Sequence, residues 1–351
     1  MRHVHYALMT VLLCFNLACV LAGGHWVWLG FLAALFLSTI IDEAAGDDIR
    51  PASVSTAPVM ILDALLYATL PLLSLNTLAF AHLVGRETTT AFEIVGGMMA
   101  LGLLYGAAGI NAAHELVHRT NNTTALNVGR MLLAFSFDTT FAIEHVYGHH
   151  RNVATAADPA TARRGENVFA FALRSVRDGN FSALEIERER LNRKNLPFWS
   201  INNRALSWQV ASILILGIWY LFAGWLGIAV ATVTGLLGKF YLEAVNYIEH
   251  YGLVRVPGQP VEARHSWNCY RGITNSLLYN LARHSHHHRF AAKPFWALEV
   301  EGNAPQMPHG YMTMIVTSLI PPLWNRMMNP LLASWDRDMA NAAERALALQ
   351  H

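Results

Sequence analysis

The stretch FEIVGGMMALGLLYGAAGINAAHELVHR, residues 92–119, runs from an apolar segment directly into two histidines. A transmembrane helix needs about 20 mostly apolar residues, and residues 92–113 meet that length. His114 and His118 follow four residues apart, which places them on one face of a helix. Neutral imidazole binds iron, zinc and copper. This stretch therefore predicts a membrane helix that carries a metal-binding motif at its end.

Three further clusters of histidines have the spacing of metal ligands. They lie in EHVYGHHRNVAT (144–155), NYIEHYG (246–252) and LARHSHHHR (281–289), which together supply His145, His149, His150, His250, His284, His286, His287 and His288. One iron or zinc ion takes about four to six ligands. About nine grouped histidines therefore predict two metal ions rather than one.

The helical period divides the histidines of these clusters. His145 and His149 are four residues apart, and His284, His287 and His288 share one helical face. His286 lies off that face, so we expect it to contact the ligands from outside or to face solvent. His250 stands alone at the end of an apolar helix, where a structural role is as common as metal binding. A histidine-rich run can also be an incidental metal-binding tract on a loop.

The composition predicts a membrane protein. The chain of 351 residues is 54% hydrophobic and 14% charged, against about a quarter charged in ordinary soluble domains. A net charge of +1 without a basic stripe argues against nucleic acid as a partner. Cys14, Cys19 and Cys269 form no CxxC pair, which argues against disulfides, an iron–sulfur site or a fused rubredoxin. We expect all three to be small core hydrophobes.

Six apolar stretches are long enough, or nearly so, to cross a membrane. They are approximately residues 5–22, 26–41, 58–81, 92–113, 206–223 and 225–247. The N-terminus resembles a signal peptide, but a second apolar run follows at once, so we interpret it as a membrane anchor. The predicted fold is a single all-α integral membrane domain, 1–351. It has six transmembrane helices and a histidine-rich helical cap formed by residues 114–205 and 248–351.

The distribution of basic residues predicts the orientation. Of the 25 Lys and Arg residues, 20 lie from Arg151 onward, and ten of these lie in the loop 151–205. The connections expected on the opposite side, 23–25, about 82–91 and 224, carry only Arg86. By the positive-inside rule the cap faces the cytoplasm. We therefore expect a multi-pass protein of the inner (plasma) membrane whose four histidine clusters all reach the cytoplasmic face.

The segment LNVGRMLLAFSFDTTFAIEH (126–145) resembles a seventh span. A full crossing would carry His145 to the opposite face from His118, and the two could not share a metal. The segment also contains Arg130 and Asp138, which are costly at bilayer depth. We interpret it as a helix packed under the bundle or as a re-entrant segment.

HELVH by itself has the HExxH pattern of a zinc metalloprotease, with Glu115 as general base. Such a protease needs about three protein ligands, so several histidine clusters would be left without a role. We prefer to interpret Glu115 as a carboxylate that orients a metal-binding imidazole by accepting its free N–H.

In this order, HELVHR, EHVYGHHRNVAT, NYIEHYG and LARHSHHH resemble the membrane alkane 1-monooxygenases (AlkB-type alkane hydroxylases). That family lies within the membrane fatty acid desaturase and hydroxylase superfamily. The resemblance continues in DPATARRGE (158–166), HSWN (265–268) and APQMPHGY…IPPLW (304–324), and it covers about Trp26 to Asp336. HWVWLG and APQMP are also similar to xylene monooxygenase hydroxylase subunits.

The resemblance implies a six-helix membrane domain with a non-haem di-iron centre. It also implies nine ligands, and thereby assigns His250 as one: His114, His118, His145, His149, His150, His250, His284, His287 and His288. Two positions depart from the family: Val117 stands where glycine is usual, and His286 where aspartate is usual. The loss of that acid affects either donor docking or the charge around the metals.

The implied reaction uses O2 and external electrons to hydroxylate an unactivated C–H bond. The expected substrate is the terminal methyl of an n-alkane, which gives a 1-alkanol. Benzylic hydroxylation of alkyl-aromatics and fatty acyl desaturation or hydroxylation remain alternatives. A histidine-lined metal transporter is disfavoured because its ligands would line a path through the bilayer. Small residues (Ala33, Ala34, Gly97, Gly102 and Gly106) either leave a substrate channel between helices or only pack them closely.

An all-imidazole ligand set carries no negative charge, so we expect carboxylates nearby. The candidates are Glu115, Glu144, Glu249, Asp138 and Asp158, for which capping or snorkelling is the alternative role. The electron donor is expected to be a rubredoxin or ferredoxin-like protein with its NAD(P)H-dependent reductase. An acidic donor is expected to dock on Arg163, Arg164, Arg188, Arg190, Arg193 and Lys194. Determining topology and contacting anionic lipid explain these basic residues equally well.

Overall fold

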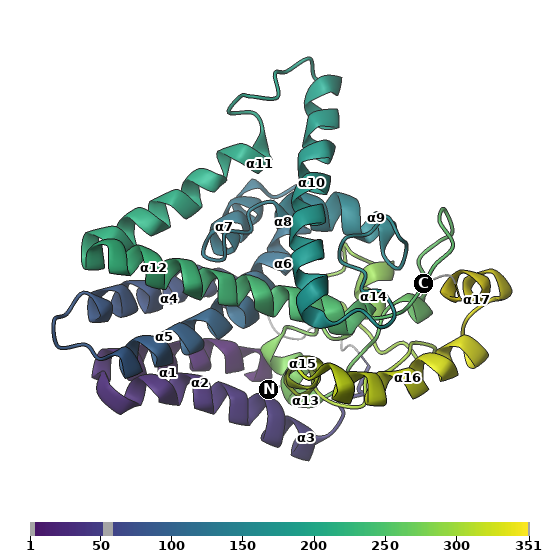
Figure 1. Cartoon of the computed structure of the whole chain (residues 1–351), viewed down its shortest axis with the longest axis horizontal. Helices are drawn as coiled ribbons and strands as arrows, with labels where there is room; N and C mark the ends of the chain where they lie inside the picture. The colour runs from purple at the N-terminus through teal and green to yellow at the C-terminus, as the bar shows by residue number, and fades with distance from the viewer. Residues whose placement is uncertain (1–3, 52–58, 350–351) are drawn as a thin grey trace.

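The apolar stretches fold into a bundle of long helices beside a group of shorter ones (Figure 1). The computed structural model describes residues 4–51 and 59–349, and all regular structure within these ranges is helical apart from two isolated β-bridges. The bundle contains α1 (Leu8–Ala22), α2 (Val27–Phe36), α4 (Val59–Val84), α5 (Ala91–Leu104) and α12 (Gln209–His250). The shorter helices that concern the site are α3 (Asp42–Ala45), α6 (Asn111–Val117), α7 (Thr123–Ala134), α8 (Phe141–Glu144), α9 (His150–Asn152), α13 (Gly272–Leu277), α14 (His284–Arg289) and α15 (Tyr311–Ser318). The remaining ones are α10 (Val168–Arg193), α11 (Arg204–Ser207), α16 (Pro321–Asp338) and α17 (Ala342–Ala348).

Five helical stretches in the described ranges are long and apolar enough to cross a membrane, where the sequence predicts six. They are Val4–Ala22, Gly24–Ala45, Val59–Val84, Ala91–Val117 and Arg204–His250. The last has 47 residues and contains both of the final predicted spans. It is interrupted at Ala223 and Gly224, where Gly224 has φ 57°, a conformation that glycine adopts at little cost. Figure 1 shows the two halves of α12 folding back on each other at this point.

The turns between the long helices meet at one end of the bundle. The Gly24 N–H donates to Oε1 of Glu93, at 2.7 Å, and so joins the first turn to the start of α5. Gly85, at the end of α4, lies so close to the break in α12 that a Cβ there would be 2.1 Å from the carbonyl oxygen of Phe222. The helices α6, α9 and α14, which carry histidines, lie away from this end (Figure 1).

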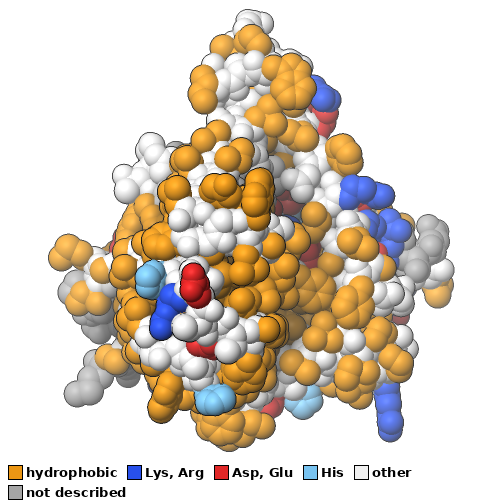
Figure 2. Space-filling model, turned by 60° about the vertical axis from the view of Figure 1, so that its left-hand side comes forward, with side chains coloured by type: hydrophobic (Ala, Val, Ile, Leu, Met, Phe, Trp, Pro, Cys, Tyr) orange, Lys and Arg blue, Asp and Glu red, His pale blue; other side chains and the backbone are white. Residues whose placement is uncertain are grey.

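The outside of the bundle is apolar. Leu32, Met60, Leu221 and Trp225 are all exposed, with Leu221 and Trp225 at 83% and 75%. Figure 2 shows hydrophobic side chains covering the face around the turns, with only isolated charged groups among them. Contiguous apolar surface of this kind is rare on soluble monomers. Length, composition and surface therefore identify an integral membrane protein.

The segment 126–145 is not a single long helix. α7 has 12 residues, about 18 Å, which is too short to cross a bilayer. It packs against α6, where Gly129 leaves room for Val117, because a Cβ on Gly129 would lie 2.9 Å from Cγ1 of Val117. The structure thus agrees with a helix packed against the bundle, and it shows how Val117 is accommodated.

The two charged residues of this segment both have partners. Asp138 accepts from Nζ of Lys239 at 2.7 Å, and the guanidinium of Arg130 lies over the Trp208 ring at 5.4 Å. A buried carboxylate needs such a partner because desolvation of an unpaired charge is costly. Lys239 of α12 therefore explains how Asp138 is tolerated in an apolar segment.

Candidate metal centre

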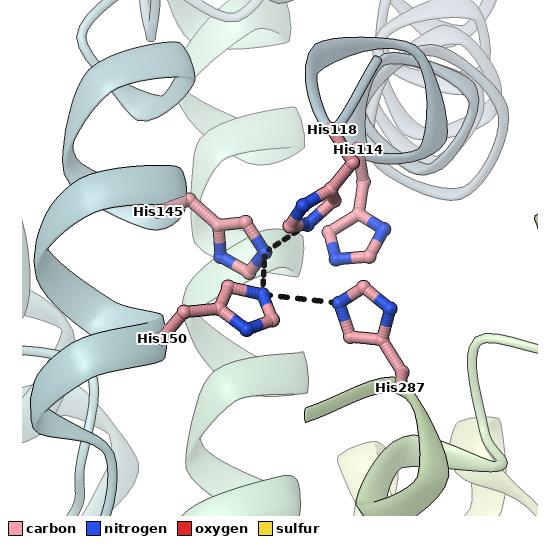
Figure 3. A group of neighbouring side chains, drawn as sticks. All are labelled: His114, His118, His145, His150 and His287. Atoms are coloured by element: carbon pink, nitrogen blue, oxygen red, sulfur yellow. Dashed lines mark hydrogen bonds between the residues drawn. The ribbon is translucent and has the colours of Figure 1, made fainter. Parts of the chain in front are cut away.

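Five histidines from three segments converge in one group. His114 and His118 come from the end of α6, His145 and His150 from the α8–α9 region, and His287 from α14 (Figure 3). Nε2 of His145 lies 3.1 Å from Nε2 of His118 and 3.1 Å from Nε2 of His150. Each residue offers one ring nitrogen such that all five lie within 4.8 Å of one another. This group can hold a metal ion.

The other four predicted ligands form a second group beside the first. His149, His250, His284 and His288 also offer nitrogens within 4.8 Å of one another. The Nε2 atoms of His250 and His284 are 3.1 Å apart. The two groups adjoin, since the rings of His150 and His288 are 4.5 Å apart between centroids. All nine histidines that the sequence singles out as ligands therefore lie in two neighbouring groups, and the metal-protease pattern accounts for only two of them.

A π-helical turn decides which histidine joins which group. Residues His145–His149 form a π-helical turn, which is wider than an α-helical one, so residues five apart align. His145 is consequently grouped with His150, and His149 points to the other group. The spacing of four residues between His145 and His149 therefore does not place them in the same group. α14 likewise divides its histidines, with His287 in the first group and His284 and His288 in the second.

The start of α14 is anchored by two of the segments outside the histidine clusters. The Ser285 N–H donates to Oδ1 of Asn268 at 2.9 Å, and the Ser285 hydroxyl donates to the Ala263 carbonyl at 2.6 Å. Asn268 in turn donates its own N–H to the Pro305 carbonyl at 2.9 Å. The HSWN and APQMP segments thus position α14, which supplies ligands to both groups.

The imidazoles are suited to binding a metal rather than protons. Burial, reinforced by neighbouring imidazoles, lowers the pKa of His145, His150 and His287 well below the usual value and that of His118 to about 4. Metal ligation requires neutral imidazole. Nε2 of His114 and Nε2 of His149 are buried and have no hydrogen-bond partner among the described residues. Buried polar atoms normally have a partner, and a metal ion in each group would supply one.

Two of the predicted carboxylates contact the groups. Asp158 lies against His149, with Oδ2 at 2.9 Å from Nδ1. Burial would lower the pKa of His149, but Asp158 outweighs it and raises that pKa. Glu249 lies beside the second group, with Oε2 at 3.3 Å from Nε2 of His284, while its Oε1 accepts from the Tyr311 hydroxyl at 2.8 Å. Sequence reasoning missed Tyr311, although it belongs to the APQMPHGY segment.

The other predicted partners of the imidazoles point elsewhere. Glu115 accepts from Arg119 at 3.1 Å rather than from an imidazole, because it follows His114 by one residue and so lies about 100° around the helix. Glu144 accepts from the Ser182 hydroxyl at 3.4 Å, and Asp138 pairs with Lys239. These three carboxylates therefore have partners other than an imidazole, and the charge-balancing role expected of them stays a prediction, for which Glu144 lines a pocket together with His145.

His286 was expected to contact the ligands or to face solvent, and it does neither. The side chain is 3% exposed. Its Nδ1 accepts from the Glu299 N–H at 3.3 Å, and its Nε2 lies 3.4 Å from Nζ of Lys293. His286 therefore fixes the loop after α14 on the side away from the two groups.

The six predicted docking residues do not form one surface. Arg163 and Arg164 precede α10, whereas Arg188, Arg190, Arg193 and Lys194 lie at its end or just after it. α10 has 26 residues and is about 39 Å long, and Arg188, the first residue of the second set, already lies about 30 Å along it from Val168. Three of the six are in ion pairs: Arg164 with Asp336, Arg188 with Glu185 and Arg190 with Glu187.

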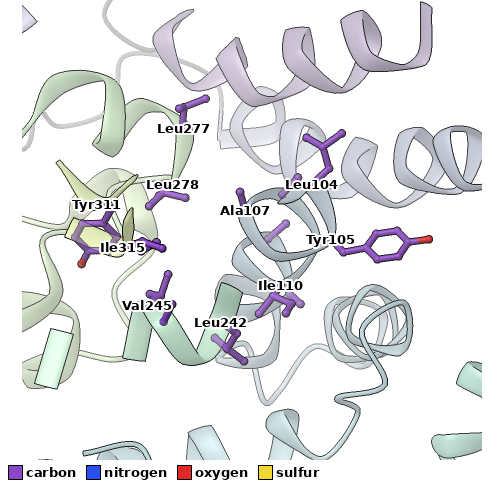
Figure 4. Packing of buried hydrophobic residues seen from close by; sticks show 14 of the residues in the cluster. Leu104, Tyr105, Ala107, Ile110, Leu242, Val245, Leu277, Leu278, Tyr311 and Ile315 are labelled. Atoms are coloured by element: carbon purple, nitrogen blue, oxygen red, sulfur yellow. The ribbon is translucent and has the colours of Figure 1, made fainter. Parts of the chain in front are cut away.

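An apolar cavity reaches both histidine groups. Its walls include Ile110 from the π-helical turn between α5 and α6, Leu242 and Val245 of α12, and Leu278 just after α13, which lie near one another in Figure 4. The same cavity is lined by His114, His145, Glu249 and His284. A second apolar cavity extends toward α1 and α2 and shares Tyr241 and Leu278 with the first.

The small residues on the second and fourth predicted spans divide between the two expected roles. Gly106 lines the first cavity and Ala34 the second. A Cβ on Gly97 would lie 2.1 Å from the Phe80 ring, and one on Gly102 would lie 2.8 Å from Cβ of Leu237. Gly97 and Gly102 therefore serve close helix packing.

Comparison with known proteins gives one family and a set of relatives. The family model described as fatty acid desaturase matches residues 90–318. The chain is 34% identical over 321 residues to alkane 1-monooxygenase 2 of Pseudomonas aeruginosa, covering 88% of this chain and 85% of that protein. It is 36% identical over 266 residues to the alkane 1-monooxygenase of Acinetobacter baylyi, covering 74% and 64%. It is also 31% identical over 355 residues to the xylene/toluene monooxygenase hydroxylase component XylM of Pseudomonas putida, covering 99% and 94%.

Proposed function

The chain belongs to the fatty acid desaturase family, and from this premise we propose that it is a membrane di-iron monooxygenase that hydroxylates an unactivated C–H bond. The preferred substrate is the terminal methyl of an n-alkane, and the product is the 1-alkanol. One observation carries the proposal: nine imidazoles in two adjoining groups lie beside an apolar cavity. The similarity to two alkane 1-monooxygenases supports it.

The residues present fit two iron ions. His114, His118, His145, His150 and His287 would hold one, and His149, His250, His284 and His288 the other. Bound iron would supply the activation of O2 and the oxidant for the C–H bond. Because imidazole is neutral, Asp158 and Glu249 would provide the nearest negative charge, Asp158 through His149 and Glu249 beside His284.

The apolar cavity would bind and orient the substrate. A hydrocarbon has no polar group by which a site can hold it, so the shape of the cavity must place the reacting carbon. Ile110, Leu242 and Val245 would enclose the chain while His145 and Glu249 mark the end at which chemistry occurs. The same walls exclude water from the reacting end.

In the membrane, the two halves of α12 would count as separate crossings, which gives six in a single domain, 1–351. The turn between α1 and α2, the turn between α4 and α5 and the break in α12 would then lie on the outer side of the inner membrane. The histidine groups would lie on its cytoplasmic side. The asymmetry of Lys and Arg supports this orientation.

Electrons would come from a rubredoxin or ferredoxin-like protein and its NAD(P)H-dependent reductase. We place its docking at Arg163 and Arg164, because both line a pocket together with Asp158, the partner of His149. Arg188, Arg190, Arg193 and Lys194, at the far end of α10, would instead face anionic lipid.

A second candidate function is benzylic hydroxylation of an alkyl-aromatic. The match to the xylene/toluene monooxygenase component, over 99% of this chain, favours it. The experiment is product analysis of whole cells given octane, dodecane and xylene, with His145→Ala as the inactive control. A 1-alkanol from either alkane supports the proposal. A benzylic alcohol alone supports the second candidate, and an alkene from a fatty acyl chain rejects both.

A further inference from the structure

Two cavities of opposite character meet at the first histidine group. The apolar cavity that reaches the histidines and a separate polar cavity are both lined by Phe141, His145 and Asn246. The polar cavity lies between the 138–145 segment, α10 and α12. Its other lining residues include the charged side chains of Asp138, Glu144, Lys239 and Glu243. Phe141 and Asn246 therefore separate a hydrocarbon compartment from one rich in charge.

The charged groups of the polar cavity form a connected set. Nζ of Lys239 lies 2.7 Å from Oδ2 of Asp138 and 2.7 Å from Oε1 of Glu243. The remaining oxygen, Oε2 of Glu243, is buried without a hydrogen-bond partner among the described residues, in a side chain only 3% exposed. A buried carboxylate oxygen without a protein partner is satisfied by water where the site is polar and roomy enough.

The connected charged groups extend from the protein surface toward His145. Val176, Gly179 and Asn180 of α10 are partly exposed, and the Lys239 side chain is 15% exposed, so this end approaches solvent. His145 lies at the inner end. The apolar cavity has no comparable set of charges apart from Glu249.

We propose that the polar cavity holds water and conducts protons to the metal centre, with Lys239, Glu243 and Asp138 as its relay. This inference rests on the proposed function, because the hydroxylation reaction consumes protons. In that reaction RH, O2, two electrons and two protons give ROH and H2O. The donor protein supplies the electrons, one oxygen atom enters the C–H bond, and the other leaves as water. The hydrocarbon enters on one side of Phe141 and the protons on the other.

The first test locates the water without using activity. Radiolytic hydroxyl-radical footprinting of the full chain in lipid nanodiscs oxidises buried side chains that adjoin trapped water. Pro159 is buried in the wall of the polar cavity, while Leu242 and Leu278 are buried in the wall of the apolar one. We expect Pro159 to be oxidised and both leucines to be protected. Equal protection of all three would overturn the proposal.

The second test uses Glu243→Gln, which keeps an acceptor for Lys239 but cannot carry a proton. We expect unchanged metal content and alkane KM, a kcat lowered at least about tenfold, and a larger solvent deuterium isotope effect on kcat. The matched control is Glu189→Gln, at an exposed position of α10. It should have the metal content, KM, kcat and isotope effect of the parent chain. Asp138→Asn replaces Glu243→Gln if that variant does not fold.

The outcomes separate this inference from the proposed function. If the parent chain hydroxylates an alkane while Glu243→Gln, or Asp138→Asn in its place, keeps the kcat and isotope effect of the parent chain, the proton route is wrong and the proposed function stands. If the parent chain hydroxylates none of the substrates, the proposed function fails, and the footprint of Pro159 against the two leucines decides the water-filled cavity on its own.

Discussion

Oδ2 of Asp158 lies 2.9 Å from Nδ1 of His149, and both side chains are buried. The carboxylate accepts the Nδ1–H and leaves Nε2, which has no other partner among the described residues, facing the four-histidine group. A carboxylate in this position orients the imidazole and makes it a better ligand. The contact thus connects the pocket that contains Arg163 and Arg164 to one of the two groups.

Asp158→Asn tests this contact. The amide keeps the size of the side chain but removes its charge, so we expect metal affinity to fall about 10- to 100-fold. Competition between the metal-free protein and a chelator for Co²⁺ measures it. Asp178→Asn, at an ion pair with Arg177 on the outside of α10, is the control and should bind as the parent does. Equal metal affinity of Asp158→Asn and Asp178→Asn would show that Asp158 does not support metal binding.

His250→Ala is expected to lower the bound metal from two ions per chain to about one. His250 is buried and contributes to the four-histidine group, and loss of one of four ligands weakens that site alone. His286→Ala is the matched control, because its imidazole contacts Glu299 and Lys293 instead, and it should keep both ions. Elemental analysis for iron and zinc together measures this, since either metal can fill the site. Full occupancy in His250→Ala would refute the ligand role.

The division made by the π-helical turn predicts a pattern in multiple variants. His149→Ala combined with His250→Ala removes two ligands of the four-histidine group, so about one metal ion should remain. His145→Ala, His149→Ala and His150→Ala combined leave three ligands in each group, so close to no metal should remain. If His145, His149 and His150 instead served one site, this triple variant would keep one ion.

Tyr241→Ala is expected to admit longer substrates. The Tyr241 ring borders both apolar cavities and packs on Gly106, where a Cβ would lie 2.4 Å from the ring. Removing the ring joins the cavities, so the ratio of long-chain to short-chain alcohol should rise at least about tenfold. Gas chromatography of products from an octane and hexadecane mixture measures it. Leu236→Ala, on the exposed side of α12, is the control, and an equal ratio in both variants would argue against Tyr241 as the boundary.

The junction of α10 and α11 predicts a dependence of stability on pH. Burial of Glu187 would raise its pKa, but hydrogen bonds from Arg190 and Arg204 outweigh it and lower the pKa to about 2. Because the folded pKa is below the unfolded value of about 4.3, the stabilisation is complete above that value and is lost as pH falls toward 2. It amounts to about 3 kcal/mol at most.

Thermal unfolding in detergent between pH 6 and pH 3 measures this contribution. The parent chain should lose stability over that interval more steeply than Glu187→Gln, which carries no titrating group at this position. Glu185→Gln, at an exposed pair with Arg188, is the control and should follow the parent chain. Parallel curves for the parent chain and Glu187→Gln would contradict the assignment.

Much of the architecture follows from local sequence. Apolar length placed the long helices, and the i, i+4 spacing of His114 and His118 and of His284 and His288 predicted pairs that the structure keeps in common groups. The regrouping of His145 with His150 depends on a π-helical turn, which no α-helical period predicts.

Tertiary contacts account for the other differences. Glu115 turns to Arg119, which also pairs with Asp63 of α4, and Asp138 finds Lys239 about 100 residues away in sequence. The basic residues of 151–205 are separated because α10 is one straight 26-residue helix. Proximity in sequence suggested one docking surface, whereas the helix carries the two sets to its opposite ends.

The most direct test of the central claim is the number of metal ions that the nine histidines hold. Protein produced with abundant iron, purified without oxygen and examined by elemental analysis and Mössbauer spectroscopy, should contain about two non-haem iron ions per chain. It should fall to about one in His250→Ala and remain at two in His286→Ala. One ion or fewer in the parent chain, unchanged by His250→Ala, would contradict the account.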